Sequence, residues 1–254
     1  MIEARLQTDA DGAILFDPAA TAQGQRFEPG WFDRAYWQRQ GLADSSPGGR
    51  GEVSYVRAPF GHCVLRHYHR GGMVARVLGD RYLWTGAERT RSFAEFRLLV
   101  ELYGRRLPVP KPVAARYRRQ GLHYRADLIT RCIENTRTLA AILTAGCCDK
   151  AVAGDVGATI ARFHAAGVYH ADLNAHNILL DGHAVSVVDF DRGDLRHPAR
   201  NWQLGNLMRL KRSLLKLGAD SEGQADFEHG LWSPLMQAYE REFDVARSRA
   251  GSPA

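Results

Sequence analysis

Long apolar runs and cysteines are scarce in this chain. No run approaches the roughly 18 apolar residues of a membrane-spanning helix, and the first residues have no basic segment leading into an apolar one. We therefore expect neither a transmembrane nor a secreted protein but a cytoplasmic one. Four cysteines with no Cys-x-x-Cys pair provide neither a zinc knuckle nor a disulfide framework. We expect them to be reduced and to serve as small apolar residues.

The composition is that of a globular protein. Of 254 residues, 45% are hydrophobic and 24% are charged, with 25 Gly and 10 Pro, which excludes a disordered, collagenous or low-complexity chain. The length fits one large domain or two small lobes. Lys and Arg number 34 against 28 Asp and Glu, for a net charge of +6. Such a surface favours anionic partners, whether nucleotides, nucleic acid or acidic lipids.

Hydrophobic periodicity predicts a β-rich first half and a mainly helical second half, hence an α+β fold. Alternation bounded by turn residues indicates strands, and apolar residues three and four apart indicate helices. In chain order we predict strands at 52–56, 63–68 and 126–133, and helices at 92–103, 136–146 and 150–166. Ser92 is expected to cap the helix at 92–103. Beyond residue 194 the chain reads as helical, with a loose tail at 248–254.

This order divides the chain into three parts. We assign residues 1–45 to an N-terminal extension, residues 46–132 to a β-rich N-lobe and residues 133–254 to a mainly helical C-lobe. The two lobes are expected to join near residues 131–136. No internal repeat interrupts this arrangement.

The residues with the clearest chemistry flank a predicted β-hairpin. Two apolar strands surround the turn pair Asp181-Gly182, a strong hairpin signal. The string His170-Ala-Asp-Leu-Asn-Ala-His-Asn177 precedes the hairpin, and Asp189-Phe190 follows it. The hairpin therefore holds polar side chains at the ends of two short, rigid strands.

Three of these side chains carry oxygen: Asp172, Asn177 and Asp189. Phosphoryl transfer needs one carboxylate to receive or orient the acceptor hydroxyl, and hard oxygen ligands to hold Mg²⁺ against the nucleotide phosphates. The alternative is that Asp172 and Asn177 only cap local turns. Turn capping does not explain the joint spacing, so we favour the phosphoryl-transfer interpretation.

The same residues resemble the protein-kinase-like superfamily. The string from His170 to Asn177 matches the catalytic loop H-x-D-L-x-x-x-N, and Asp189 begins a match to D-F-G. This resemblance implies a two-lobed protein-kinase-like fold with ATP and Mg²⁺ as cofactors. It makes Asp172 the catalytic base, Asn177 and Asp189 the metal ligands, and His170 the residue that orients the loop.

The match is looser in the expected N-lobe. A glycine-rich segment precedes the first strands and can bring backbone N–H groups close to phosphates, although a plain loop explains it equally well. Its glycines are Gly48, Gly49 and Gly51. V-A-I-K is missing; Arg66 is the best replacement for its lysine, and Arg76 is a rival. Glu95 fits as the ion-pair partner, or alternatively as a capping-box glutamate.

Two differences from the protein-kinase motifs narrow the choice of family within this superfamily. Asp191 replaces the glycine of D-F-G, and no A-P-E follows. Only residues 192–201 separate Asp189 from the next helix, which leaves no room for a long phosphorylatable segment and argues against a protein substrate. Runs over about 45–220 resemble the lipopolysaccharide-core sugar kinases, among them Leu65-Arg-His-Tyr-His-Arg-Gly-Gly, Asp80-Arg-Tyr-Leu-Trp-Thr-Gly and Asp189-Phe-Asp-Arg-Gly193.

The resemblance is strongest to those family members that act on 3-deoxy-D-manno-octulosonic acid (Kdo). It implies ATP-dependent phosphorylation of the 4-hydroxyl of Kdo on lipid A precursor, by a peripheral protein at the cytoplasmic side of the bacterial inner membrane. The N-lobe would bind nucleotide and the C-lobe would bind the acceptor. Because the acceptor carries a carboxylate and phosphates, we expect Arg192 and Arg196, just past Asp191, to lie near it.

One later helix has two interpretations. Leu207, Leu210, Leu214 and Leu217 fall on one stripe, and Arg209, Arg212 and Lys216 on another. A basic amphipathic helix can lie on an anionic membrane, but a core helix with a charged solvated face has the same pattern. The second is the more frequent case.

Alternative functions remain open. The chain can be a kinase of another core sugar such as heptose, or of a small molecule. It can also be an inactive kinase-like binding module, which the change from Lys to Arg favours and the intact Asp172, Asn177 and Asp189 oppose. A nucleic-acid-binding role ranks last, because the chain has no recognition motif and its positive charge is modest.

Overall fold

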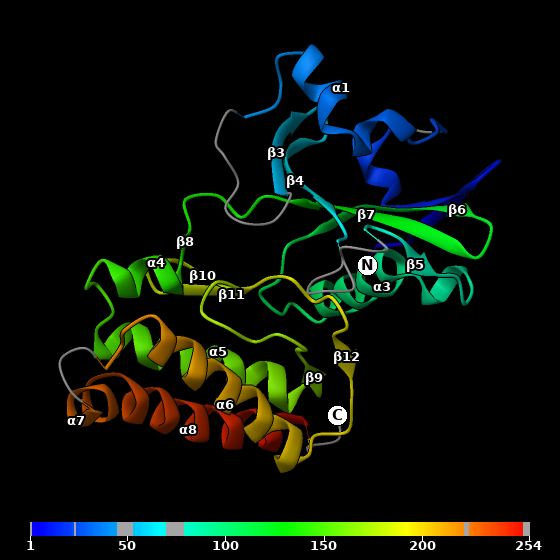
Figure 1. The fold of residues 1–254 in the computed structure, drawn as a ribbon. Coiled ribbons are helices and arrows are strands. Elements are labelled where there is room, and N and C mark those ends of the chain that lie inside the picture. The colour runs from blue at the N-terminus through cyan, green and yellow to red at the C-terminus, as the bar shows by residue number, and fades with distance from the viewer. Residues whose placement is uncertain (1, 23, 45–52, 70–78, 221–223, 251–254) are drawn as a thin grey trace. The chain divides into compact units, whose positions relative to one another are not determined.

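The computed structural model describes residues 2–22, 24–44, 53–69, 79–220 and 224–250 and divides into two compact units. The first unit comprises Met1–Arg105 and Pro110–Ile133, and the second comprises Arg106–Val109 and Glu134–Ala254. Figure 1 shows a β-rich first part and a helical later part, so the predicted α+β class is confirmed. Our predictions for Gly48, Gly49, Gly51 and Arg76 lie outside the described residues.

The first unit is built on an antiparallel sheet of seven described strands. Along the sheet they run β1-β2-β6-β7-β4-β3, and β5 pairs with β7. The strands are β1 (Arg5–Asp9), β2 (Gly12–Phe16), β3 (Val53–Ala58), β4 (Gly61–His67), β5 (Tyr82–Leu83), β6 (Pro112–Gln120) and β7 (His123–Arg131). The helical segments are η1 (Pro18–Ala20), η2 (Pro29–Phe32), α1 (Arg34–Arg39), η3 (Ala87–Arg89) and α3 (Arg91–Gly104).

Strands β3, β4 and β7 appear where the sequence predicts them, whereas β1, β2 and β6 were not predicted. Residues 5–16, which we assigned to an N-terminal extension, form β1 and β2 and pair through β2 with β6 in the same sheet. Strand β6 escaped detection because it opens on Pro112 and ends in a polar, arginine-rich run. It is stabilised by pairing with β2 on one side and with β7 on the other.

The two faces of the sheet are covered by different parts of the chain. Helix α3 packs on one face, where Phe93 contacts Tyr117 edge to face. The neighbouring residue Arg116 points to the other face, as alternation along a strand requires, and its guanidinium lies over Phe32. An aromatic cluster covers this second face. It contains Phe16, Phe27, Trp31, Phe32 and Trp37.

A chain of charged residues continues along the second face. Arg116 donates to Asp127 at 2.8 Å, and Asp127 contacts His67 at 2.6 Å. The other nitrogen of His67 contacts Asp80 at 3.1 Å, and Asp80 pairs with Arg125 at 2.7 Å. Burial would raise the pKa of Asp127, but the hydrogen bond to His67 and the Arg116 charge lower it. The alternating charges explain how the sheet buries so many ionic groups.

His67 makes the stability of this unit depend on pH. Its hydrogen bond to Asp127 raises the pKa of His67 above 6.5. Because the folded-state pKa is raised, the charged ring stabilises the fold below about pH 6.5, and this stabilisation is lost as pH rises through the folded-state value. We expect the unfolding free energy to fall more steeply between about pH 6 and 8 in the wild type than in His67→Gln.

Urea denaturation at several pH values measures that slope. His183→Gln is the matched control: His183 contacts Asp155 at 2.7 Å, but its side chain is 78% exposed, so solvent screens the pair. The control should keep the wild-type slope. An identical slope in His67→Gln would contradict the prediction.

The second unit is mainly helical. Its helices are α4 (Leu139–Thr144), α5 (Lys150–Ala165), α6 (Arg200–Lys216), α7 (Gln224–Phe227), the π-helical segment η4 (Glu228–Trp232) and α8 (Ser233–Ala250). Its short strands are β8 (Arg137–Thr138), β9 (Val168–Tyr169), β10 (Ile178–Asp181), β11 (Ala184–Val187) and β12 (Asp194–Leu195). The predicted helix at 150–166 and the predicted hairpin are confirmed as α5 and the β10–β11 pair.

Helices α5 and α8 make the main packing contact of this unit. Asp149 caps α5 by accepting from the Val152 N–H at 2.9 Å. Gly157 allows the close approach, because a Cβ there would lie 2.0 Å from the Leu235 carbonyl oxygen. Any larger residue at position 157 would push the two helices apart.

Helix α6 is a core helix. Leu207, Leu210 and Leu214 are buried, at 1% exposure or less, so the alternative in which this leucine stripe lies on a membrane is wrong. Within the part of the chain that the structure describes, no helix has the length and apolarity to cross a membrane.

Candidate active site

The β10–β11 hairpin brings two predicted metal ligands to the same end of a strand pair. Ile178 pairs with Val187, and the Val188 N–H donates to the Asn177 carbonyl at 3.0 Å. Asn177 therefore enters the hairpin where Asp189 leaves it. The turn lies at the opposite end of the hairpin. The pairing of the two strands therefore holds Asn177 and Asp189 next to each other.

His170 connects the loop before the hairpin to the segment after it. Its Nε2 lies 3.0 Å from the Val188 carbonyl, and its Nδ1 lies 3.1 Å from the Asp172 N–H. One nitrogen faces an acceptor and the other a donor, which defines a neutral ring with the proton on Nε2. Burial lowers the pKa of His170 and keeps it neutral. The predicted orienting role agrees with this geometry.

Asn174, which the sequence did not single out, caps the local turn. Its Oδ1 accepts from the N–H groups of His176 at 2.8 Å and Asn177 at 3.2 Å. Its Nδ2 donates to the Asp172 carboxylate at 3.0 Å. Asn177 donates from Nδ2 to the Asp172 carbonyl at 2.9 Å. The side chains of Asn174 and Asn177 thus both bond to the backbone of this loop, and Asp172 is exposed.

Asp189 has a left-handed backbone, with φ of 64°. This conformation is uncommon outside glycine, although Asp tolerates it better than most residues. The next residue, Phe190, is 1% exposed and packs on His170 and Phe163, with ring centroids 4.9 and 5.8 Å away. Burial of Phe190 therefore helps to hold the left-handed backbone of Asp189 in place.

Side chains of helix α6 hold the loop through hydrogen bonds to its backbone. Asn206, 1% exposed, accepts from the His170 N–H at 3.2 Å and donates to its carbonyl at 2.9 Å. Arg209 donates to the Ala171 carbonyl, and Ser213 accepts from the Ala175 N–H at 3.1 Å. A sequence signal for this role exists, because Asn206 is a polar residue next to Leu207 in the buried stripe of a helix. We did not predict the role from it.

The donor set suits magnesium. Asn177 uses its amide nitrogen on the loop, which leaves the amide oxygen as a possible ligand, and Asp189 supplies a carboxylate. Two protein oxygens completed by phosphate oxygens and water are a usual arrangement for Mg²⁺ in nucleotide enzymes. Among the described residues, no group of three or more His, Cys, Asp and Glu side chains is arranged to hold a metal ion.

The first unit holds a separate predicted pair. Arg66 on β4 forms an ion pair with Glu95 on α3, and Tyr68 donates to the same carboxylate at 2.7 Å. Arg66 also donates to the Tyr68 hydroxyl at 2.9 Å, and its guanidinium lies 4.6 Å from that ring. Burial raises the pKa of Tyr68 well above 10, so the hydroxyl stays a donor.

The capping-box alternative for Glu95 is wrong, because its carboxylate is 3% exposed and bonds to Arg66 and Tyr68. The prediction that Ser92 caps this helix is also wrong. The helix begins at Arg91 after Thr90, and the Ser92 hydroxyl donates to the Arg116 carbonyl at 2.9 Å. Glu95 and Ser92 both form tertiary contacts with the sheet instead of capping the helix.

Curated proteins similar to this chain are kinases, a class of phosphotransferase. The 3-deoxy-D-manno-octulosonic acid kinase of Xanthomonas campestris pv. campestris (strain B100) is 55% identical, with 90% of each chain covered. The enzyme of the same name from Stenotrophomonas maltophilia (strain K279a) is 50% identical, with 81% of each covered. Residues 34–239 match the lipopolysaccharide kinase (Kdo/WaaP) family, and the chain belongs to that family.

Among solved structures, WaaP in complex with acyl carrier protein is similar over 89% of this chain and 93% of its own, at 15% identity and a TM-score of 0.49.

Proposed function

We propose that this chain transfers the γ-phosphoryl group of ATP to the 4-hydroxyl of Kdo on lipid A precursor. The relatives at 50 and 55% identity are named 3-deoxy-D-manno-octulosonic acid kinase. The observation that carries the proposal is the loop–hairpin cluster, in which hydrogen bonds tie His170, Asp172 and Asn177 to the residue before Asp189. A kinase of heptose remains the second candidate, distinguished only by the acceptor.

Each residue of the cluster has a proposed role. Asp172 orients the acceptor hydroxyl and takes its proton as the new phosphate ester bond forms. Asn177 and Asp189 would hold Mg²⁺, whose charge neutralises the transferring phosphoryl group when it is bound. His170, neutral and bonded at both nitrogens, is a positioning residue that keeps Asp172 and Asp189 at constant relative geometry.

We further propose that the two compact units are the two lobes of a protein-kinase-like fold. In the first unit, Arg66 would bind nucleotide phosphates while Glu95 holds its side chain in place, the role that Lys and Glu share in that superfamily. Residues 48–51 are proposed as the phosphate-binding glycine segment. The acceptor is an anionic glycolipid, so the protein would work peripherally at the cytoplasmic side of the inner membrane, without nucleic acid.

Mass spectrometry of Kdo-bearing lipid A precursor after incubation with the chain, ATP and Mg²⁺ tests the proposal. The expected product is heavier by one phosphate group, and tandem fragmentation places that group on Kdo. A parallel incubation with a heptose-bearing acceptor tests the second candidate. An unchanged Kdo lipid and a phosphorylated heptose acceptor would replace the first function by the second.

Arg192 and Arg196 provide a test of acceptor binding. Both are exposed, and the Arg196 guanidinium lies 3.6 Å from the Tyr169 ring centroid. We expect Arg192→Ala and Arg196→Ala each to raise the acceptor KM about tenfold with little change in the KM for ATP, because each removes one cation facing an anionic substrate. Arg241→Ala, which removes an exposed cation of α8, is the control. Near-normal acceptor KM in both variants would contradict the prediction.

A further inference from the structure

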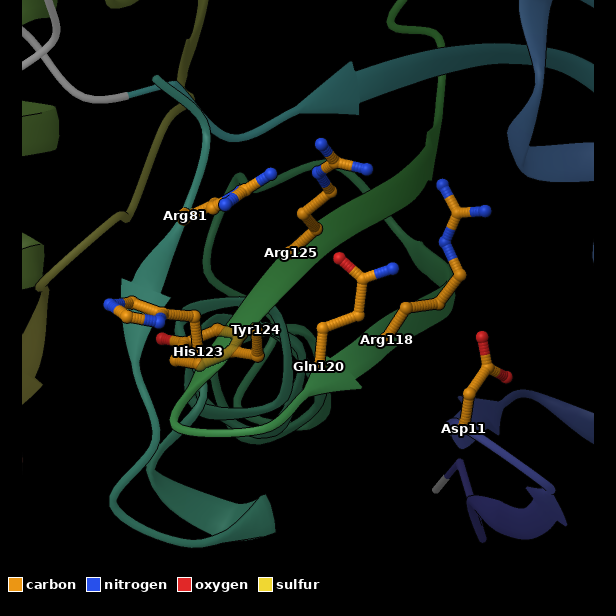
Figure 2. Close-up of a pocket in the computed structure, with 7 residues that line it drawn as sticks. All are labelled: Asp11, Arg81, Arg118, Gln120, His123, Tyr124 and Arg125. Carbon is orange, nitrogen blue, oxygen red and sulfur yellow. The ribbon is translucent and has the colours of Figure 1, made fainter. Parts of the chain in front are cut away.

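A polar pocket lies on the first unit, at the end of the β6–β7 hairpin (Figure 2). It is open to solvent. Three arginines line it, together with one acidic residue and three other side chains. The lining residues are Asp11, Arg81, Arg118, Gln120, His123, Tyr124 and Arg125.

This pocket is distinct from the Arg66–Glu95 pair. Arg118 lies directly opposite Arg125 across the β6–β7 ladder, and Arg116 lies opposite Asp127. These residues share the face of the sheet that the aromatic cluster covers, whereas Arg66 points to the face with α3. Within the first unit, the pocket therefore lies on the opposite face of the sheet from Arg66.

Two of the arginines face each other across the β6–β7 ladder. Like charges directly opposite each other destabilise a strand pair, and Figure 2 shows the Arg118 and Arg125 guanidinium groups on the same side of the hairpin, with the Gln120 amide beside them. Asp80 pairs with Arg125 at 2.7 Å. The Arg118 Nε is buried and has no hydrogen-bond partner among the described residues. Asp11 contributes the single carboxylate of the lining. The arrangement favours a bound anion that accepts several hydrogen bonds.

Two apolar side chains flank the pocket. Leu122, in the β6–β7 turn, is 72% exposed, and Leu83 on β5 is 60% exposed, the highest values among the large hydrophobic side chains of the described residues. Leu83 lies opposite His123 in the sheet, and the Trp84 N–H donates to the Leu122 carbonyl at 2.9 Å. The two leucines therefore sit together beside the arginines. Exposed leucines next to cations are the pattern of a surface that meets the headgroup region of a membrane.

We propose that this pocket binds the phosphate group of an acidic lipid, with Leu83 and Leu122 entering the apolar side of the same lipid surface. The guanidinium groups of Arg81, Arg118 and Arg125 supply planar donors that match phosphate oxygens. The leucines select a membrane lipid over a soluble phosphate, because a soluble anion gains nothing from apolar neighbours. The inference adds a lipid-contact site to the peripheral attachment proposed above and does not depend on phosphoryl transfer.

Co-sedimentation of the full chain with vesicles tests this site. One set is phosphatidylcholine alone and the other contains about one third phosphatidic acid, whose headgroup is a phosphate monoester. We expect binding to the acidic vesicles only, weakened at high salt. Arg118→Gln, Arg81→Gln and the pair Leu83→Ser/Leu122→Ser should each lower the partition about tenfold. Arg57→Gln, which removes a charge from a 75% exposed side chain of β3, should stay within about twofold of wild type.

Titration with inorganic phosphate separates the two sources of the anion. Weak phosphate binding together with strong vesicle binding supports the lipid assignment. Phosphate binding that Arg118→Gln abolishes, without vesicle binding by the wild type, overturns it. Equal partition of Arg118→Gln, Arg81→Gln and Arg57→Gln also overturns it. If the chain binds acidic vesicles through these residues but phosphorylates no Kdo lipid, the proposed function fails and the lipid site stands.

Discussion

Asp172→Asn is expected to lower kcat about a thousandfold and to leave the affinity for nucleotide within about twofold. An amide has nearly the shape of a carboxylate and can still accept from the Asn174 side chain, which bonds the wild-type carboxylate at 3.0 Å. The backbone contacts of residue 172 to His170 and Asn177 do not involve its side chain. The variant therefore loses the proton acceptor and keeps the loop.

The measurement pairs single-turnover phosphate transfer with calorimetric titration of the nucleotide. Asp181→Asn is the matched control, since Asp181 is an exposed carboxylate at the end of β10, next to the turn of the same hairpin. Its turnover should stay within about twofold of wild type, because it lies at the opposite end from the cluster. Undiminished turnover of Asp172→Asn would refute the role of Asp172 as the base and leave orientation to other groups.

The second large effect is expected from Arg66→Ala. The substitution removes the guanidinium that pairs with Glu95, whose side chain is 3% exposed. Removing one member of a buried ion pair costs about 3 kcal/mol, because the attraction between the two charges is lost while the remaining charge stays desolvated. We therefore expect the unfolding free energy to fall by about that amount, and the KM for ATP to rise about tenfold if Arg66 binds phosphates.

A double substitution distinguishes the ion pair from simple loss of packing. Arg66→Ala/Glu95→Gln also removes the buried negative charge, so it should be more stable than Arg66→Ala alone while keeping the raised KM. Arg97→Ala is the control on the same helix: its pair with Glu88 has side chains 50 and 59% exposed, and such pairs contribute about 1 kcal/mol or less. Equal losses in Arg66→Ala and Arg97→Ala would contradict the account.

The catalytic segment was predictable because its information is local. A strong turn pair, two short apolar runs and polar residues at their ends specify the hairpin and place Asn177 and Asp189 at one end of it. The amphipathic helix before the loop was equally local and appears as α5. Roles for Asp172 and its neighbours came from resemblance and remain predictions that the experiments above test.

The supporting contacts were not predictable, because their partners are remote in the sequence. Asn206 binds His170 across 36 residues, and Arg116 binds Asp127 on the next strand and Asp33 in the N-terminal segment, 83 residues away. A polar residue within a helix or strand breaks the hydrophobic pattern, and its structural role is not evident until its hydrogen-bond partner is known. For the same reason β6 was overlooked and Glu95 could be assigned two roles.

By itself the sequence determined the α+β class and the hairpin with its three oxygen-bearing side chains, because periodicity and spacing along the chain encode both. The family came from the resemblance of its motifs to those of known kinases. Only the tertiary structure decided that residues 5–16 complete the first sheet, that Glu95 pairs with Arg66, that the leucines of α6 are buried, and that three arginines and two exposed leucines meet at one hairpin. Burial and pairing depend on which distant residues become neighbours, and a linear pattern does not specify that.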